Sequence, residues 1–145
     1  MDLDATGLFD TNFEPYQFPE GKIILCGVPG AFTPGCTQKH LPGFVDKLDE
    51  LQDYKVIFMA VTDGCVMEAW NKHHGHPDIE VVADPLAKFS KSIGMDHDYG
   101  ESMGIRCKRF ALLIEDQKIV KEFKKPWAED VIVNYDTRCC RIFRC

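Results

Sequence analysis

The most reactive arrangement in the sequence is a cysteine at the start of an expected helix. Cys36 follows a loop, residues 29–35, in which Pro29 and Pro34 restrict the backbone. Unpaired N–H groups and the helix dipole favour an anion at such a position. Since a helix N-terminus with a nearby cation lowers a thiol's pKa, Cys36 is a candidate nucleophile. Thr33, on the same loop, can direct its hydroxyl toward that sulfur or toward a molecule bound to it.

Buried strands and helices alternate through the first two thirds of the chain. Continuous apolar runs closed by turn residues are typical of strands buried on both faces of a sheet, and they occupy residues 22–28, 54–62 and 79–83. Apolar residues at helical spacing predict a helix that begins after the loop, at about residue 36, and ends at about residue 53, and two more helices over residues 66–74 and 86–93. The amino-terminal residues 1–21 are predicted to be an irregular lead-in.

The last third of the chain is expected to add the remaining strands to the sheet. Residues 95–108 are predicted to be a loop, and residues 109–115 and 118–123 a hairpin turning at Asp116-Gln117. A final helix is expected over residues 128–135. This order predicts one α/β domain over residues 1–145, a three-layer sandwich around a central mixed sheet. The thioredoxin fold has the same order of elements.

The charge and the apolar segments of the sequence indicate which kinds of partner and location to expect. The 145 residues carry 17 Lys+Arg against 23 Asp+Glu, a net charge of −6, which argues against nucleic acid or an anionic membrane as the main partner. The longest uncharged stretch, residues 23–38, contains prolines and glycines and is too short to span a bilayer comfortably. The acidic amino end is not followed directly by an apolar segment, so a cytoplasmic protein is expected, with an organelle not excluded.

The other cysteines divide by position. Seven is an odd number, so a complete internal disulfide framework is impossible. Cys26 is expected in the core, while Cys65 and Cys107 lie near the ends of elements, where exposure is possible. The tail, residues 136–145, places Cys139 and Cys140 beside arginines, which lower thiol pKa values and promote disulfide exchange. These two are either resolving thiols or part of an adventitiously oxidisable tail.

Histidines are expected to serve packing or solvation rather than metal binding. The His73, His74 and His76 cluster has no Cys-x-x-Cys partner elsewhere, which favours a solvated helix end over a metal site. His40, one helical turn after Cys36, either braces the same pocket or packs.

Residues 29–36 read Pro-Gly-Ala-Phe-Thr-Pro-Gly-Cys and fit the pattern Pro-x-x-x-Thr-x-x-Cys. Together with residues 27–28 and 40–44, this segment resembles the peroxiredoxin-5-like (atypical, type II) branch of the peroxiredoxins, and the likeness continues more loosely to about residue 123. The resemblance implies Cys36 as peroxidatic nucleophile, Thr33 as hydroxyl donor, Pro29 as pocket wall and Arg109 as the guanidinium. The ends depart from the family pattern: its amino-terminal hairpin and closing helix are hard to recognise.

The chemistry of peroxide reduction needs these residue types. A thiolate attacks one peroxide oxygen, and negative charge moves onto the departing oxygen. A guanidinium cannot deprotonate and offers fixed donors for that charge. The product sulfenic acid must condense with a second thiol before it oxidises further.

The resemblance therefore implies a thiol peroxidase for hydrogen peroxide and small alkyl hydroperoxides. It is expected to be a homodimer, to need no cofactor, and to be reduced by thioredoxin, glutaredoxin or glutathione. A thioredoxin-like disulfide oxidoreductase is disfavoured because Thr33 stands where Cys-x-x-Cys would need a cysteine. A binding or chaperone-like domain that kept the fold and lost turnover is the alternative.

Overall fold

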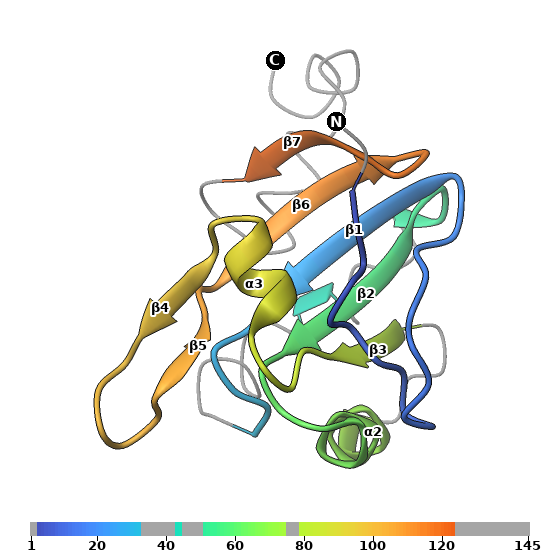
Figure 1. The fold of residues 1–145 in the computed structure, drawn as a ribbon. Helices are drawn as coiled ribbons and strands as arrows, with labels where there is room; N and C mark the ends of the chain where they lie inside the picture. Colours follow the sequence, from blue (N-terminus) through green and yellow to red (C-terminus); the bar gives the residue numbers. More distant parts are fainter. Residues whose placement is uncertain (1–2, 33–42, 45–50, 75–78, 124–145) are drawn as a thin grey trace.

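Five strands form the central sheet of the computed structural model, which describes residues 3–32, 43–44, 51–74 and 79–123. Their order across the sheet is β3-β2-β1-β6-β7 (Figure 1). The strands are β1 (Lys22–Gly27), β2 (Lys55–Ala60), β3 (Ile79–Ala83), β6 (Phe110–Glu115) and β7 (Lys118–Phe123). Strands β1, β2 and β3 are parallel, whereas β6 runs antiparallel to both β1 and β7. The predicted mixed sheet is confirmed.

Both faces of the sheet are buried because the central strands are apolar throughout. On β1, Ile24 and Cys26 point into one hydrophobic cluster and Ile23 and Leu25 into the other, as the two-residue period of a strand requires. All four side chains are fully buried. Each face therefore needs its own covering layer.

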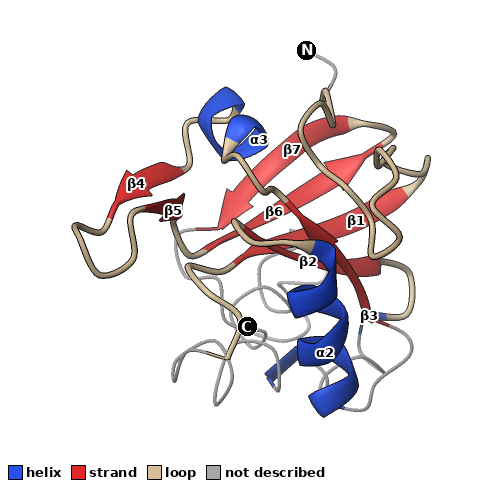
Figure 2. Cartoon of the chain, turned by 60° about the horizontal axis from the view of Figure 1, so that its bottom comes forward, coloured by secondary structure: helices blue, strands red, loops and turns tan. Residues whose placement is uncertain are grey.

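Helix α2 (Gly64–His74) and helix α3 (Lys88–Ser92) lie on opposite faces of the sheet (Figure 2). Met67 and Trp70 of α2 pack in the cluster that contains Ile24 and Cys26, while Phe89 of α3 packs in the other. The three-layer α/β architecture expected from the sequence is confirmed. The helix predicted over about residues 36–53 lies mostly outside the described residues, although Phe44 and Leu51 from it are buried in the α2 layer.

The buried carboxylate of Asp84 fixes the start of α3. Its oxygens accept hydrogen bonds from Phe89 N at 3.2 Å, Ser90 N at 2.8 Å and Ser90 Oγ at 2.7 Å. Asp84 is fully buried, so these donors replace the water that its charge loses. Helix α3 is shorter than the predicted 86–93 because the backbone at Ala87 is left-handed, with φ 57°.

Residues 95–108 are not a loop, which corrects the prediction. They form a two-stranded hairpin, β4 (Asp96–Asp98) with β5 (Ile105–Cys107), that projects from one end of the sheet (Figure 1). Gly100 and Gly104 both take positive φ, 85° and 71°, where side chains are strained. These glycines, expected to mark a loop, instead make the turn of a hairpin.

The described part of the lead-in, residues 3–21, is irregular but is part of the core. Phe9 forms isolated antiparallel bridges with Pro15 and with Ala83 of β3, so this segment reverses direction and covers part of the sheet edge. Leu8, Tyr16 and Phe18 pack in the same layer as Phe89. The final helix predicted over residues 128–135 and the tail lie outside the described residues.

Candidate active site

The carboxyl end of β1 is the point from which the chain runs on to Cys36. Val28 N donates to Met59 O of β2 at 3.0 Å, extending the parallel ladder by one residue. Pro29 has no N–H, so it cannot continue that ladder. The backbone pairing thus stops before Pro29, the half-buried proline predicted to form the pocket wall.

Strand pairing brings Arg109 to the same edge. Gly27 of β1 is paired with Phe110 of β6, and the two strands are antiparallel. Arg109, immediately before Phe110, therefore lies at the edge where β1 ends. Its side chain is half-buried and its Nη1 atom is fully buried. The sheet register thus explains how a residue so distant in sequence comes to lie near the end of β1.

Gly27 permits this pairing to be close. A Cβ atom at Gly27 would lie 1.9 Å from Cε2 of Phe110 and 2.5 Å from both Cδ2 and Cζ. The aromatic ring therefore occupies the space that a side chain at position 27 would need. Nothing in the sequence alone identified Gly27 as a supporting residue, because the contact depends on β6.

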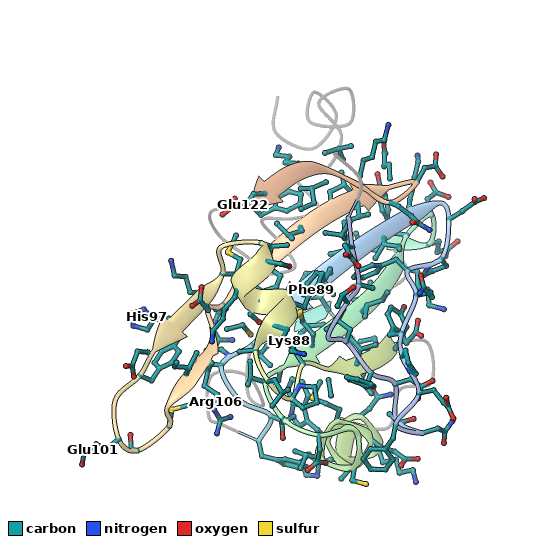
Figure 3. The ribbon with its side chains drawn as sticks, in the orientation of Figure 1. Lys88, Phe89, His97, Glu101, Arg106 and Glu122 are labelled. Atoms are coloured by element: carbon teal, nitrogen blue, oxygen red, sulfur yellow. The ribbon has the colours of Figure 1, made fainter. Side chains whose placement is uncertain are left out.

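Strand β5 also touches the end of β1, which the sequence analysis missed by treating this region as a loop. The Cys107 thiol donates to Val28 O at 3.0 Å, and Arg106 Nη1 donates to Pro29 O at 3.4 Å. Figure 3 shows Arg106 beside the segment that leaves β1. The sequence signal for β5 was the short run Ile105-Arg106-Cys107, which lies between Gly104 and the predicted strand that contains Phe110.

The backbone is left-handed at Phe32, where φ is 64°. The Phe32 side chain is exposed, and its ring lies 5.8 Å from that of His73 on α2, centroid to centroid. A non-glycine residue in this conformation is uncommon, and such strain clusters at functional sites. Thr33 and Cys36, which follow it, lie outside the described residues, as do Cys139 and Cys140.

Three other cysteines are described, and none of them forms a disulfide. Cys26 is fully buried, as predicted, and burial raises the pKa of its thiol, so it is inert as a nucleophile at neutral pH. Cys65 is exposed, whereas Cys107 is buried. Across the part of the chain that the structure describes, no three His, Cys, Asp or Glu side chains are grouped to hold a metal ion. No helix in that part is long and apolar enough to cross a membrane.

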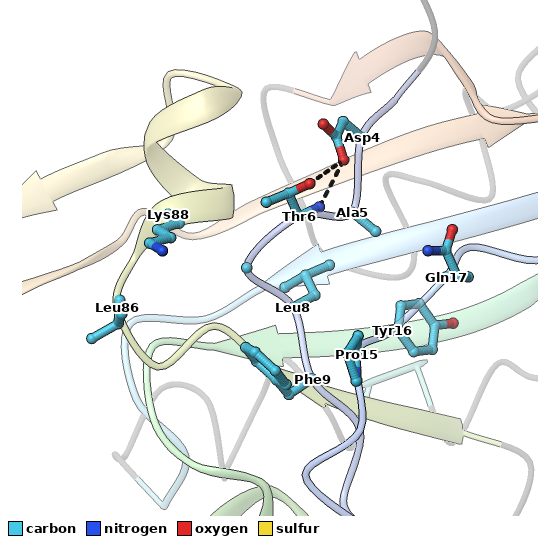
Figure 4. Close-up of a pocket in the computed structure, with 11 residues that line it drawn as sticks. Asp4, Ala5, Thr6, Leu8, Phe9, Pro15, Tyr16, Gln17, Leu86 and Lys88 are labelled. Atoms are coloured by element: carbon cyan, nitrogen blue, oxygen red, sulfur yellow. Dashed lines mark hydrogen bonds between the residues drawn. The ribbon is translucent and has the colours of Figure 1, made fainter.

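A pocket of about 340 Å³ lies between the amino-terminal segment and the start of α3 (Figure 4). Leu8, Pro15 and Leu86 contribute apolar lining. The Asp4 carboxylate accepts hydrogen bonds from Thr6 Oγ1 and Thr6 N, which lower the pKa of Asp4. Among the described residues of the candidate active site, neither Pro29 nor Arg109 lines this pocket.

Comparison with known proteins agrees with a redox enzyme of thioredoxin-like fold. The family model described as Redoxin matches residues 4–136. Peroxiredoxin-2B of Arabidopsis thaliana is 37% identical over 123 residues, covering 77% of this chain and 76% of the relative.

Two solved peroxiredoxins share the architecture. Reduced Prx3 of Vibrio vulnificus in complex with hydrogen peroxide superposes with a TM-score of 0.86 at 27% identity, covering 94% of this chain and 97% of the other. Peroxiredoxin 5 of Alvinella pompejana gives 0.80 at 26% identity, covering 92% and 94%.

The mixed five-stranded sheet, with a helix on each face, defines a thioredoxin-like α/β protein. The chain belongs to the peroxiredoxin family, in its peroxiredoxin-5-like branch. It is a thiol-dependent peroxidase, and the alternative of a binding or chaperone-like domain is not favoured.

Proposed function

We propose that this chain reduces hydrogen peroxide and small alkyl hydroperoxides at a site made by Cys36, Thr33, Pro29 and Arg109. The observation that carries the proposal is the β1–β6 register, which brings Arg109 to the end of the strand that leads to Cys36. Hydrogen peroxide is the ligand named for the Vibrio vulnificus relative, and this supports it as the substrate here.

In the proposed reaction, the Cys36 thiolate attacks one peroxide oxygen and the O–O bond breaks. Sulfur loses two electrons and becomes a sulfenic acid, while the other oxygen leaves as hydroxide or alkoxide and takes up a proton. Arg109 stabilises both the thiolate and the charge that develops on the departing oxygen. The Thr33 hydroxyl donates a hydrogen bond to the peroxide, and Pro29 forms a wall of the pocket.

We propose that a second thiol then condenses with the sulfenic acid, releasing water and forming a disulfide. Among the described cysteines, Cys26 and Cys107 are buried, which argues against either as that thiol. Cys139 or Cys140 is one candidate resolving residue, and an external thiol is the other. Two further thiols, from thioredoxin, glutaredoxin or glutathione, reduce an internal disulfide, whereas one further thiol reduces a mixed disulfide with an external thiol.

The same proposal covers the organisation of the protein. We expect one domain over residues 1–145, because the described strands from Lys22 to Phe123 share one five-stranded sheet apart from the β4–β5 hairpin. A homodimer and a reducing, cytoplasmic location are also proposed. The absence of a disulfide among the three described cysteines fits a reducing compartment.

Rapid mixing with hydrogen peroxide tests the proposed site. The fully buried Trp70 is the described fluorescence reporter. Wild-type protein is expected to give a fast change in fluorescence that Cys36→Ser abolishes, while Cys65→Ser, the exposed-cysteine control, keeps it. Equal traces for wild type and Cys36→Ser would contradict the proposal.

Intact mass measured after one equivalent of peroxide tests resolution. Loss of two mass units in wild type but not in Cys139→Ser or Cys140→Ser identifies the resolving residue. A gain of one oxygen in wild type would instead indicate an external thiol.

A further inference from the structure

Two successive carbonyl groups at the end of β1 accept hydrogen bonds from two successive side chains of β5. The Val28 carbonyl accepts from Cys107 Sγ at 3.0 Å, and the Pro29 carbonyl from Arg106 Nη1 at 3.4 Å. Arg106 also donates from Nε to Met103 O at 2.9 Å. One guanidinium therefore links the turn of the hairpin to Pro29, the second residue after β1.

These hydrogen bonds lie at the point where the backbone pairing of β1 with its neighbouring strands ends. The paired register of β1 with β6 ends at Gly27 and Phe110, and the ladder with β2 ends with Val28 N bonded to Met59 O. Buried carbonyls need donors, and Val28 is fully buried. Beyond the sheet, side chains of β5 supply those donors.

Two residues after the end of β5, the chain reaches Arg109. Lys108, the residue between Cys107 and Arg109, donates its N–H to Met95 O at 2.7 Å, so the backbone on this approach is anchored as well. Strand β5 thus joins the two segments that the proposed mechanism must align, the one that leads to Cys36 and the one that carries the guanidinium.

We infer that Arg106 and Cys107 are positioning residues for the peroxidase reaction. They fix the Val28 and Pro29 carbonyls, and so the direction in which the chain leaves β1, relative to Arg109. Cys107 acts as a hydrogen-bond donor and not as a nucleophile, since its side chain is fully buried. The inference rests on the proposed catalytic set of Cys36 and Arg109.

Arg106→Met and Cys107→Ala test this role by removing one donor each. Their matched controls are Lys108→Met, which removes a neighbouring exposed charge, and Cys26→Ala, which removes another fully buried thiol. Single-turnover rates with hydrogen peroxide are measured against pH, which yields both the rate constant and the pKa of Cys36. Thermal melts report stability separately.

We expect Arg106→Met and Cys107→Ala to react about five- to tenfold more slowly, in line with the loss of one hydrogen bond, and to have a raised Cys36 pKa. The controls are expected to keep the wild-type pKa. Cys107→Ser, which retains a donor, is expected to recover part of the rate.

A wild-type rate and pKa in both variants would overturn the inference. So would a lower melting temperature without any change in the pKa of Cys36, because that is the result of a structural role alone. If Cys107→Ala does not fold, the half-buried Arg106 still decides the question. Activity retained in Cys36→Ser would instead contradict the proposed catalytic set itself.

Discussion

Gly27→Ala is expected to damage stability and activity together. The added methyl carbon would lie 1.9 Å from Cε2 of Phe110, whereas carbon atoms pack best at about 3.5 Å or more. The ring must therefore retreat by about 1.6 Å. Phe110 is only 2% exposed and packs in the cluster with Leu25 and Leu112, so it has little room to move.

The cost of this overpacking is about 3 kcal/mol, the upper part of the usual range, because the clash involves a rigid ring in a filled core. For a chain of this size, that is a fall in melting temperature of about 6–12 °C. Since Arg109 precedes Phe110, displacement of the ring also shifts the guanidinium. Misplacement by about 1 Å can reduce a rate by about 100-fold, so a loss of at least tenfold is expected.

Thermal melts and single-turnover fluorescence with hydrogen peroxide measure both effects. Phe110→Leu supplies the matched test, because a smaller side chain opposite position 27 relieves the clash. The double variant is expected to be more stable than the sum of the two single losses by at least about 1 kcal/mol. Additive losses, or a Gly27→Ala melting temperature within about 2 °C of wild type, would refute the close packing of Phe110 on Gly27.

Asp84→Ala removes the acceptor of three hydrogen bonds in a fully buried position. Urea unfolding is therefore expected to show a loss of about 3 kcal/mol in the free energy of unfolding, and about half that loss for Asp84→Asn. Equal losses in the two variants would contradict the role of the charge. Arg109→Ala is expected to lower the rate by about 100- to 1,000-fold and to raise the pKa of Cys36, with Arg109→Lys intermediate; an unchanged rate would remove Arg109 from the site. Burial raises the pKa of the Cys26 thiol. Burial is also the main reason why the pKa of Tyr16 is raised, and the nearby Glu80 carboxylate raises it further. The folded state therefore holds these protons more tightly than the unfolded chain, so the urea midpoint should fall as pH rises above about 9, less steeply in Cys26→Ala; a flat midpoint would contradict this.

The sequence predicts the sheet well because its strands are long apolar runs. Residues 22–28 and 79–83 are recognisable without knowledge of their neighbours, and the two-residue turn at Asp116-Gln117 is confirmed, with both residues at positive φ. The β4–β5 hairpin is different. Asp96-His97-Asp98 has no apolar alternation, and its strand forms through pairing with β5 rather than through its own composition.

The candidate site was predictable only in part, for a similar reason. Pro29 and Arg109 were assigned from the resemblance of short motifs, and the sheet register supplies a physical reason for their proximity at one edge. Gly27, Arg106 and Cys107 act through contacts with residues far along the chain. Such contacts depend on how the strands pair, which no local pattern in the sequence records.

Trapping the sulfenic acid chemically tests the central claim most directly. The protein is treated with one equivalent of hydrogen peroxide in the presence of dimedone, which alkylates sulfenic acids, and the labelled peptides are identified by mass spectrometry. The account predicts one adduct, on Cys36, and a much weaker adduct in Arg109→Ala at the same short reaction time. An adduct on the exposed Cys65 with none on Cys36 would contradict it.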